Sequence, residues 1–169
     1  MPQTDSQKSQ HKVISVRGEL IEFWVTGDET AGAMCVAEVT TFPDNGPPPH
    51  IHHREDELFC VLEGKFSFLV GDSRTEANAG SYRYVPKGTL HTYRNIGTAP
   101  AKSLVVLTPA GLEKFWMEVA DMETNFKGVP GLATPETIAR LMAIAPKYGL
   151  EYERGLKVEN YSSPNRRNG

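Results

Sequence analysis

The chain of 169 residues suits one domain, and its 39% hydrophobic residues provide enough apolar material for a single core. Its formal net charge of −3 and the lack of a dense basic run argue against a nucleic-acid-binding surface. No apolar run is long enough to cross a bilayer, and the polar N-terminus lacks the apolar core of a signal peptide. We therefore expect a cytoplasmic protein without membrane or nucleic-acid partners. Cys35 and Cys60 do not form a metal-binding CxxC pair, and we expect both to be buried as small hydrophobic residues.

Residues 12–109 consist of short apolar segments separated by glycine- and proline-containing turns, a pattern typical of an all-β sandwich or barrel. Glu63 and Gly64 separate two of these segments and are typical of a tight hairpin turn. Gly71–Asp72 and residues 86–88 mark further turns. The expected strands cover residues 13–16, 20–25, 34–40, 57–62, 65–70, 82–85, 91–94 and 103–107.

After Pro109 the spacing of apolar residues changes to that of amphipathic helices. A second helix is expected to begin at Pro135, with Thr134 as its N-cap, and to stop at Pro146. We expect both apolar stripes to pack against the β-structure and the first also to close a ligand cavity. The stripes consist of Leu112, Phe115, Trp116 and Val119, and of Ile138, Leu141, Met142 and Ala145.

The chain therefore divides into four segments by composition and pattern. We expect residues 1–11 to be a disordered N-terminus, because they are polar. Residues 12–109 form the β-barrel, and residues 110–152 form a helical segment packed on it. Residues 153–169 form a polar tail.

Two histidines in an extended segment can direct their imidazoles at one point. Residues two apart in a strand share a face, so His50 and His52 point the same way and His53 points away. Glu57 lies five residues after His52, an odd offset that places it on the other face unless the chain turns between them. Its alternation with Phe59 then directs the carboxylate into an apolar interior, where it needs a partner such as a divalent cation.

His91 follows a Pro-x-Gly turn at the start of a returning strand. If this strand lies near the first, three imidazoles and one carboxylate meet. This donor set suits Fe, Mn, Co, Ni, Cu or Zn, so we expect one divalent transition metal per chain. Four protein ligands leave one or two positions open on a five- or six-coordinate metal, as a catalytic site needs.

The sequence here resembles the cupin superfamily, whose first motif is G-x5-H-x-H-x3,4-E-x6-G and whose second is G-x5-P-x-G-x2-H-x3-N. The leading glycine of the first motif is replaced by Asp44, and Gly46 stands two positions later. The resemblance covers roughly residues 12–109 and implies a jelly-roll β-barrel, here followed by two C-terminal helices. The matching residues are His50, His52, Glu57 and Gly64 in the first motif, and Gly80, Pro86, Gly88, His91 and Asn95 in the second.

The resemblance implies which of these residues hold the metal: His50, His52, Glu57 and His91. Gly80, Gly88 and Asn95 are interpreted as turn residues. A narrower similarity of layout links the chain to single-domain bacterial cupins similar to quercetin 2,3-dioxygenases, in which the glutamate can be both metal ligand and base. By that resemblance Glu57 is the catalytic base of a dioxygenase acting on an aromatic or enolic small molecule. Phe59, Tyr93, Phe115 and Trp116 are the candidates for substrate contacts.

Two other functions remain open on the sequence. A cupin isomerase, epimerase or lyase would use the same metal and the same glutamate without dioxygen. A non-enzymatic cupin would hold a metal and bind a small ligand. The family resemblance and the open sheet edges also suggest a homodimer, formed through the first strands.

Overall fold

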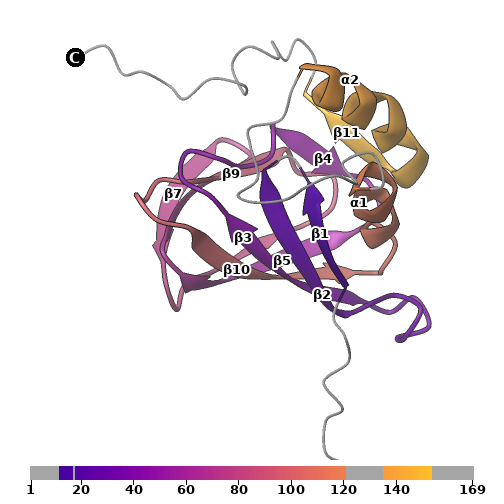
Figure 1. The fold of residues 1–169 in the computed structure, drawn as a ribbon, viewed down its shortest axis with the longest axis horizontal. Coiled ribbons are helices and arrows are strands. Elements are labelled where there is room, and N and C mark those ends of the chain that lie inside the picture. The colour runs from indigo at the N-terminus through magenta and orange to yellow at the C-terminus, as the bar shows by residue number, and fades with distance from the viewer. Residues whose placement is uncertain (1–11, 17, 121–134, 154–169) are drawn as a thin grey trace, which may run out of the picture.

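The computed structural model describes residues 12–16, 18–120 and 135–153. These residues form two antiparallel β-sheets with two helices near the C-terminal end, as Figure 1 shows. The expected all-β fold with two C-terminal helices is confirmed. Within the described ranges, neither helix has the length and apolar character needed to cross a membrane.

The strands divide into a six-stranded and a five-stranded sheet, each with strands that are not consecutive in sequence lying side by side. In the first sheet the order is β1 (Lys12–Val16), β2 (Glu19–Val25), β3 (Cys35–Thr41), β10 (Ala101–Thr108), β5 (Asp56–Glu63) and β8 (Tyr82–Val85). In the second it is β11 (Leu150–Tyr152), β4 (His50–His52), β9 (His91–Asn95), β6 (Lys65–Val70) and β7 (Ser73–Asn78). Burial alternates along these strands, so one face of each sheet lines the interior.

The turn at Gly64 differs from its prediction. Strands β5 and β6 belong to different sheets, so the expected hairpin at Glu63–Gly64 is wrong and the chain crosses between sheets there. Gly64 has a φ of 80°, and a Cβ atom on it would lie 2.5 Å from the Cβ of Ala101. A glycine with positive φ suits either a hairpin or a sharp corner, so the residue type does not decide between them. At Gly71–Asp72 the strands do form a hairpin, in which Val70 is opposite Ser73.

The two helices are α1 (Glu113–Ala120) and α2 (Pro135–Ile144), and a 3-10 turn over Ala145–Tyr148 follows α2. The first stripe is buried, and so are Ile138, Leu141 and Ala145 of the second, whereas Met142 is 36% exposed. Thr134, the expected N-cap, lies outside the described residues. The buried Glu113 carboxylate accepts hydrogen bonds from the backbone N–H groups of Gly27 (3.1 Å) and Gly111 (2.7 Å). It thereby ties the start of α1 to the turn after β2.

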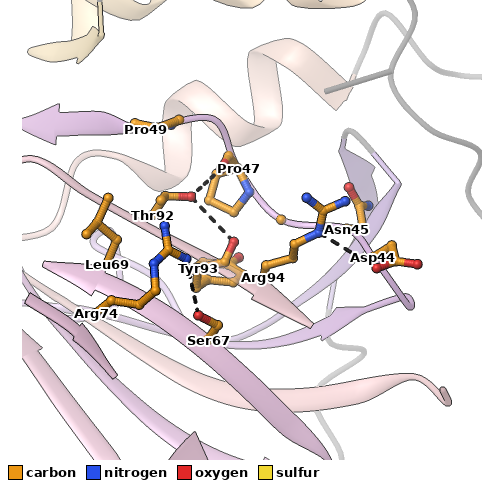
Figure 2. A pocket seen from close by; sticks show the side chains of 11 residues that line it. Asp44, Asn45, Pro47, Pro49, Ser67, Leu69, Arg74, Thr92, Tyr93 and Arg94 are labelled. Carbon is orange, nitrogen blue, oxygen red and sulfur yellow. Dashed lines mark hydrogen bonds and ion pairs between the residues drawn. The ribbon is translucent and has the colours of Figure 1, made fainter. Parts of the chain in front are cut away.

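The loop that leads into β4 packs closely on β9. A Cβ atom on Gly46 would lie 2.0 Å from the backbone oxygen of Tyr93, so only glycine fits this approach. The hydroxyl of Thr92 donates a hydrogen bond to the backbone oxygen of Pro47 at 2.6 Å, and Figure 2 shows the two residues side by side. Gly46, which stands two positions after the place of the motif glycine, therefore has a structural role. Its close approach to β9 fixes the path of the chain into His50.

Aromatic side chains fill the interior on the Phe66 side of the barrel. The rings of Phe59 and Phe68 have centroids 5.2 Å apart, and those of Phe59 and Tyr93 are 5.3 Å apart. Phe59, Phe66 and Phe68 are each no more than 1% exposed. Rings at these spacings contribute packing and favourable edge-to-face contacts, so this cluster is a substantial part of the hydrophobic core.

Candidate metal centre

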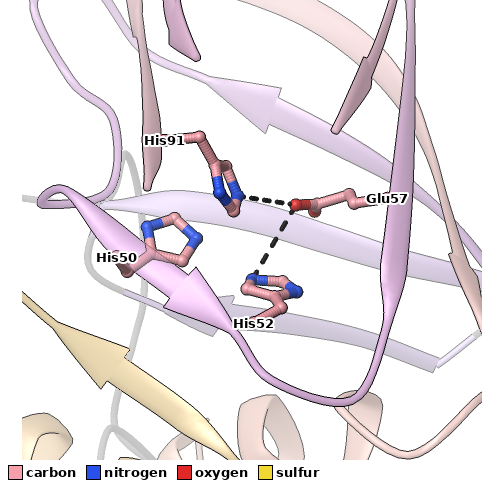
Figure 3. Close-up of side chains that lie close together, drawn as sticks. All are labelled: His50, His52, Glu57 and His91. Atoms are coloured by element: carbon pink, nitrogen blue, oxygen red, sulfur yellow. Dashed lines mark hydrogen bonds and ion pairs between the residues drawn. The ribbon is translucent and has the colours of Figure 1, made fainter. Parts of the chain in front are cut away.

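The four residues predicted to bind a metal meet at one point between the two sheets. Each offers one ligand atom, and these atoms lie within 4.8 Å of one another. Figure 3 shows the carboxylate of Glu57 facing His91 and His52, with the ring of His50 on the opposite side of the cluster. All four residues are at most 7% exposed. A transition metal holds nitrogen and oxygen ligands at about 2.0–2.2 Å, so opposite ligands stand about 4.2 Å apart and only small side-chain movements are needed.

Each ligand is placed by a local feature of the chain. His50 and His52 share the inner face of β4, and His50 is opposite His91 of β9 in the sheet register. The chain then bends at His53 and Arg54 and enters β5 in the other sheet. In an unbroken strand, the five-residue offset would place Glu57 on the face opposite to His52. The bend returns the carboxylate of Glu57 to the interior.

Hydrogen bonds to the backbone set the tautomers of two imidazoles. Nδ1 of His50 lies 2.7 Å from the oxygen of Pro48, and Nδ1 of His91 lies 2.9 Å from the oxygen of Thr89. A carbonyl oxygen only accepts, so both Nδ1 atoms carry a proton and the Nε2 atoms can present lone pairs to a metal. Such orientation of histidine ligands by an outer partner is common in metal sites. For His52, Nδ1 is buried and has no hydrogen-bond partner within the described structure.

Electrostatics in the site favour neutral His52 and ionised Glu57. Burial lowers the pKa of His52 to about 4, against the opposing charge of Glu57. Burial alone would raise the pKa of Glu57, but His52 and His91 outweigh it and hold that pKa below its usual value. Oε2 of Glu57 lies 2.9 Å from Nε2 of His91 and 3.8 Å from Nε2 of His52. Burial also opposes a charge on His91, yet the hydrogen bond with Glu57 raises its pKa, so a metal must displace a proton there.

A small cavity of about 30 Å³ opens beside this cluster. Tyr93, Phe115 and Trp116, three of the four predicted substrate contacts, line it together with His50, His52 and Glu57. Phe59 is not among the lining residues, and it packs in the aromatic core instead. Strand parity correctly directs Phe59 inward, but it does not say how far along the barrel the residue lies from the ligands.

Four lining residues were not predicted as contacts: Pro47, Leu112, Leu150 and Tyr152. Leu112 belongs to the apolar stripe that was expected to close a cavity, so the helical spacing of apolar residues could have identified it as a lining residue. Leu150 and Tyr152 lie on β11, which pairs with β4 so that Tyr152 is opposite His50 and Leu150 is opposite His52. This three-residue strand is too short for its alternation to be recognised in the sequence.

Comparisons with known proteins agree with this geometry. Residues 38–107 match the family model described as the cupin domain. This part of the chain is therefore similar to the cupin domain. Over 72 residues it is 31% identical to quercetin 2,3-dioxygenase of Bacillus subtilis, a match that covers 43% of this chain and 21% of that protein. It is also 32% identical over 76 residues to a probable germin-like protein of Arabidopsis thaliana, covering 42% and 36% of the two chains.

Solved structures show a similar fold. KdgF from Halomonas sp. has a TM-score of 0.55 and 17% identity, over 63% of this chain and 94% of that one. A predicted oxalate decarboxylase from Thermotoga maritima has a TM-score of 0.52 and 21% identity, over 59% and 91%. Identities this low show the fold alone. The chain spans about half the length, or less, of the curated relatives that it matches.

Proposed function

We propose that this cupin is a metal-dependent dioxygenase that cleaves a compact enolic substrate. The observation that carries the proposal is the buried cluster of three imidazoles and one carboxylate beside a cavity with aromatic walls. The local similarity to a quercetin 2,3-dioxygenase supports the same reaction class. Bound to these four residues, a divalent transition metal would supply a Lewis acid with open positions for a substrate oxygen and for dioxygen.

The residues of the chain orient the substrate and exclude water. Phe115 and Trp116 of α1 cover the cavity from one side, and Tyr93 from β9 contributes a further wall. The hydroxyl of Tyr93 donates to the buried carboxylate of Glu19 at 2.8 Å, which holds the ring in place. Flat apolar walls suit a planar enol, and they leave Glu57 and the open metal positions as the polar groups that the substrate meets.

Glu57 is placed to take the proton from the enol hydroxyl. Its carboxylate lies on the wall of the cavity and faces the imidazoles, so one oxygen can hold the metal while the group receives the proton. The resulting enolate is oxidised as dioxygen is reduced. Both oxygen atoms enter the products, and a carbon–carbon bond of the substrate breaks.

The size of the cavity favours a compact substrate over a flavonol. A volume of about 30 Å³ has room for roughly two water molecules, since each needs on the order of 10–15 Å³ of this space. Sites for larger organic ligands commonly reach several hundred Å³. A three-ring flavonol would have to displace Phe115 and Trp116, whereas a short 1,3-diketone in its enol form needs much less movement.

The test is oxygen consumption by the full chain loaded separately with Fe, Mn, Co, Ni or Cu. We expect uptake with the enolic probe acetylacetone, slower uptake with quercetin, and ¹⁸O from labelled dioxygen in the products. Glu57→Gln should lower the rate at least about 100-fold, as expected for loss of a general base. The matched control Glu63→Gln changes an exposed glutamate of the same strand and should leave the rate unchanged.

Three results would contradict the proposal. Turnover that persists without dioxygen would indicate an isomerase, epimerase or lyase. Tight binding of an enol without any product would indicate a binding protein. Oxygen uptake that Glu57→Gln leaves unchanged would remove Glu57 from the reaction.

A further inference from the structure

A second and larger cavity lies on the outer face of the five-stranded sheet, and nothing in the metal site uses it. Its volume is about 190 Å³, and we call it the outer-face groove. Arg74, Arg94, Ser67, Thr92, Leu69 and Pro47 are among the residues that line it (Figure 2). By the estimate used for the metal cavity, it has room for roughly a dozen water molecules, enough for a small organic molecule.

The sheet register brings the two arginines to the same face. Arg74 of β7 is opposite Leu69 of β6, and Leu69 is opposite Thr92 of β9. Arg94 lies two residues after Thr92, so both side chains of β9 leave the sheet on its outer side. Two guanidinium groups therefore border one groove from strands far apart in the sequence.

The charges of this groove are only partly neutralised. Arg94 forms a long ion pair with Asp44, with 3.9 Å between Nε and Oδ1. Arg74 donates a weak hydrogen bond of 3.4 Å to the hydroxyl of Ser67, and no carboxylate of the described residues lies within ion-pair distance of it. Two arginines and one aspartate leave the groove with a net positive charge, although the chain as a whole carries −3.

We propose that the outer-face groove binds a small organic anion through Arg74 and Arg94. Guanidinium groups donate paired hydrogen bonds that match the geometry of a carboxylate or a phosphate. The hydroxyl of Ser67, which accepts from Arg74, keeps its own proton free to donate to the same anion. Leu69, Pro47 and Pro49 offer an apolar surface to the uncharged part of the ligand. This groove therefore selects an anionic head group joined to a short apolar body.

The outer-face groove is separate from the metal cavity, although the two share walls. Pro47 and Tyr93 line both, and the two spaces lie on opposite faces of the sheet. The lining of the groove includes no metal ligand, so binding there does not require a metal. The anion-binding proposal can therefore be tested independently of the proposed dioxygenase activity.

The experiment is a titration of the metal-stripped full chain, followed by backbone amide NMR, with phenyl phosphate, benzoate and inorganic phosphate as probes. We expect saturable shifts at residues 44–49, 67–69 and 92–94, with an organic probe binding more tightly than inorganic phosphate. Arg74→Gln and Arg94→Gln should each weaken binding at least about tenfold, because each removes hydrogen bonds to a charged group. The control Lys87→Gln removes an exposed cation outside the groove and should change the dissociation constant less than twofold.

Further comparisons identify the preferred anion and test whether the geometry of the arginine side chains matters. Saturable binding of either organic probe supports the site, and the tighter one identifies the head group. Arg74→Lys keeps the charge but loses the paired donors, so it should bind more weakly than the wild type. Absence of saturable shifts for every probe at millimolar concentration would overturn the proposal. Equal weakening by Lys87→Gln would also overturn it, because binding would then follow net charge alone.

Discussion

The interior of the protein has a polar end around Glu57 and an aromatic end around Phe59. Both residues are inward-facing side chains of strand β5, and the two ends serve different purposes. At one end Glu57 meets three imidazoles, and two residues later Phe59 packs against Phe68 and Tyr93. The strand alternation is the same at both ends, and only the residue types differ. Buried ionisable groups are costly without partners, whereas buried aromatic rings stabilise the fold. Stability should therefore reside mainly in the aromatic end and metal binding in the polar end, and substitutions should separate the two.

The largest effect is expected in the aromatic end. Phe59→Ala should lower the free energy of unfolding by about 3–5 kcal/mol, because Phe59 is 1% exposed and its removal leaves a cavity. Urea denaturation of the metal-free variant measures this loss. Tyr84→Ala, at a tyrosine that is 55% exposed, should change stability by only about 0.5 kcal/mol. A metal affinity for folded Phe59→Ala as low as that of a ligand variant would break the separation between the two ends.

In the polar end, His52→Ala should lower metal affinity by about 100-fold or more, equivalent to about 2.7 kcal/mol. The neighbouring His53 provides a matched control, since its side chain is 49% exposed and pairs with Glu151 at 2.8 Å. His53→Ala should therefore leave affinity unchanged. Competition with a chromophoric chelator measures both variants. Equal affinities for the two would remove His52 from the site.

Asn95 tests whether the last residue of the second motif belongs to the fold or to the site. Its side-chain amide donates to the backbone oxygens of Thr41 (2.8 Å) and Ala99 (2.9 Å), and its oxygen accepts from the N–H of Gly97. Asn95→Ala leaves the buried backbone oxygen of Thr41 and the less buried groups of Gly97 and Ala99 without this partner, and it should cost about 1–3 kcal/mol of stability. Metal stoichiometry should stay unchanged. A variant that is stable but binds no metal would assign Asn95 to the site instead.

The smallest expected effect concerns the two thiols. Burial raises the pKa of Cys35 to about 12, with a further contribution from Glu113, so its reactive thiolate is scarce at pH 8. Cys60 is half-buried on the other face of the sheet. Ellman's reagent should therefore label Cys60 in the native protein and Cys35 only after unfolding. Mass spectrometry of the labelled peptides identifies the residue, and rapid labelling of native Cys35 would contradict this burial.

Much of the site could be predicted because its residues follow local rules. Strand parity places His50 and His52 on one face, and the odd offset of Glu57 requires the bend found at His53 and Arg54. The second motif then supplies His91. The placement of His50, His52 and Glu57 on one side follows from residue spacing and chemistry. The inclusion of His91 rests on the resemblance to the cupin motifs and on the pairing of β4 with β9, which the spacing alone does not show.

Features that depend on strand partners could not be predicted. A glycine such as Gly64 suits both a hairpin and a corner between sheets, so the pairing of β5 with β10 and β8 was not visible. The alternation of side chains along the strand predicted that Phe59 points inward, but it did not predict how far along the barrel Phe59 lies from the metal ligands. Tyr152 reaches the cavity only because β11 pairs with β4, a contact between residues about one hundred positions apart.

X-ray absorption spectroscopy of the zinc-loaded full chain tests the central claim most directly. The structure predicts one zinc per chain with three imidazole nitrogens and a carboxylate oxygen, all at about 2.0–2.2 Å. Substitution of His50 or His91 by alanine should reduce the imidazole count or abolish binding. A spectrum without imidazole scattering, or with sulfur at about 2.3 Å, would contradict a metal centre built from His50, His52, Glu57 and His91.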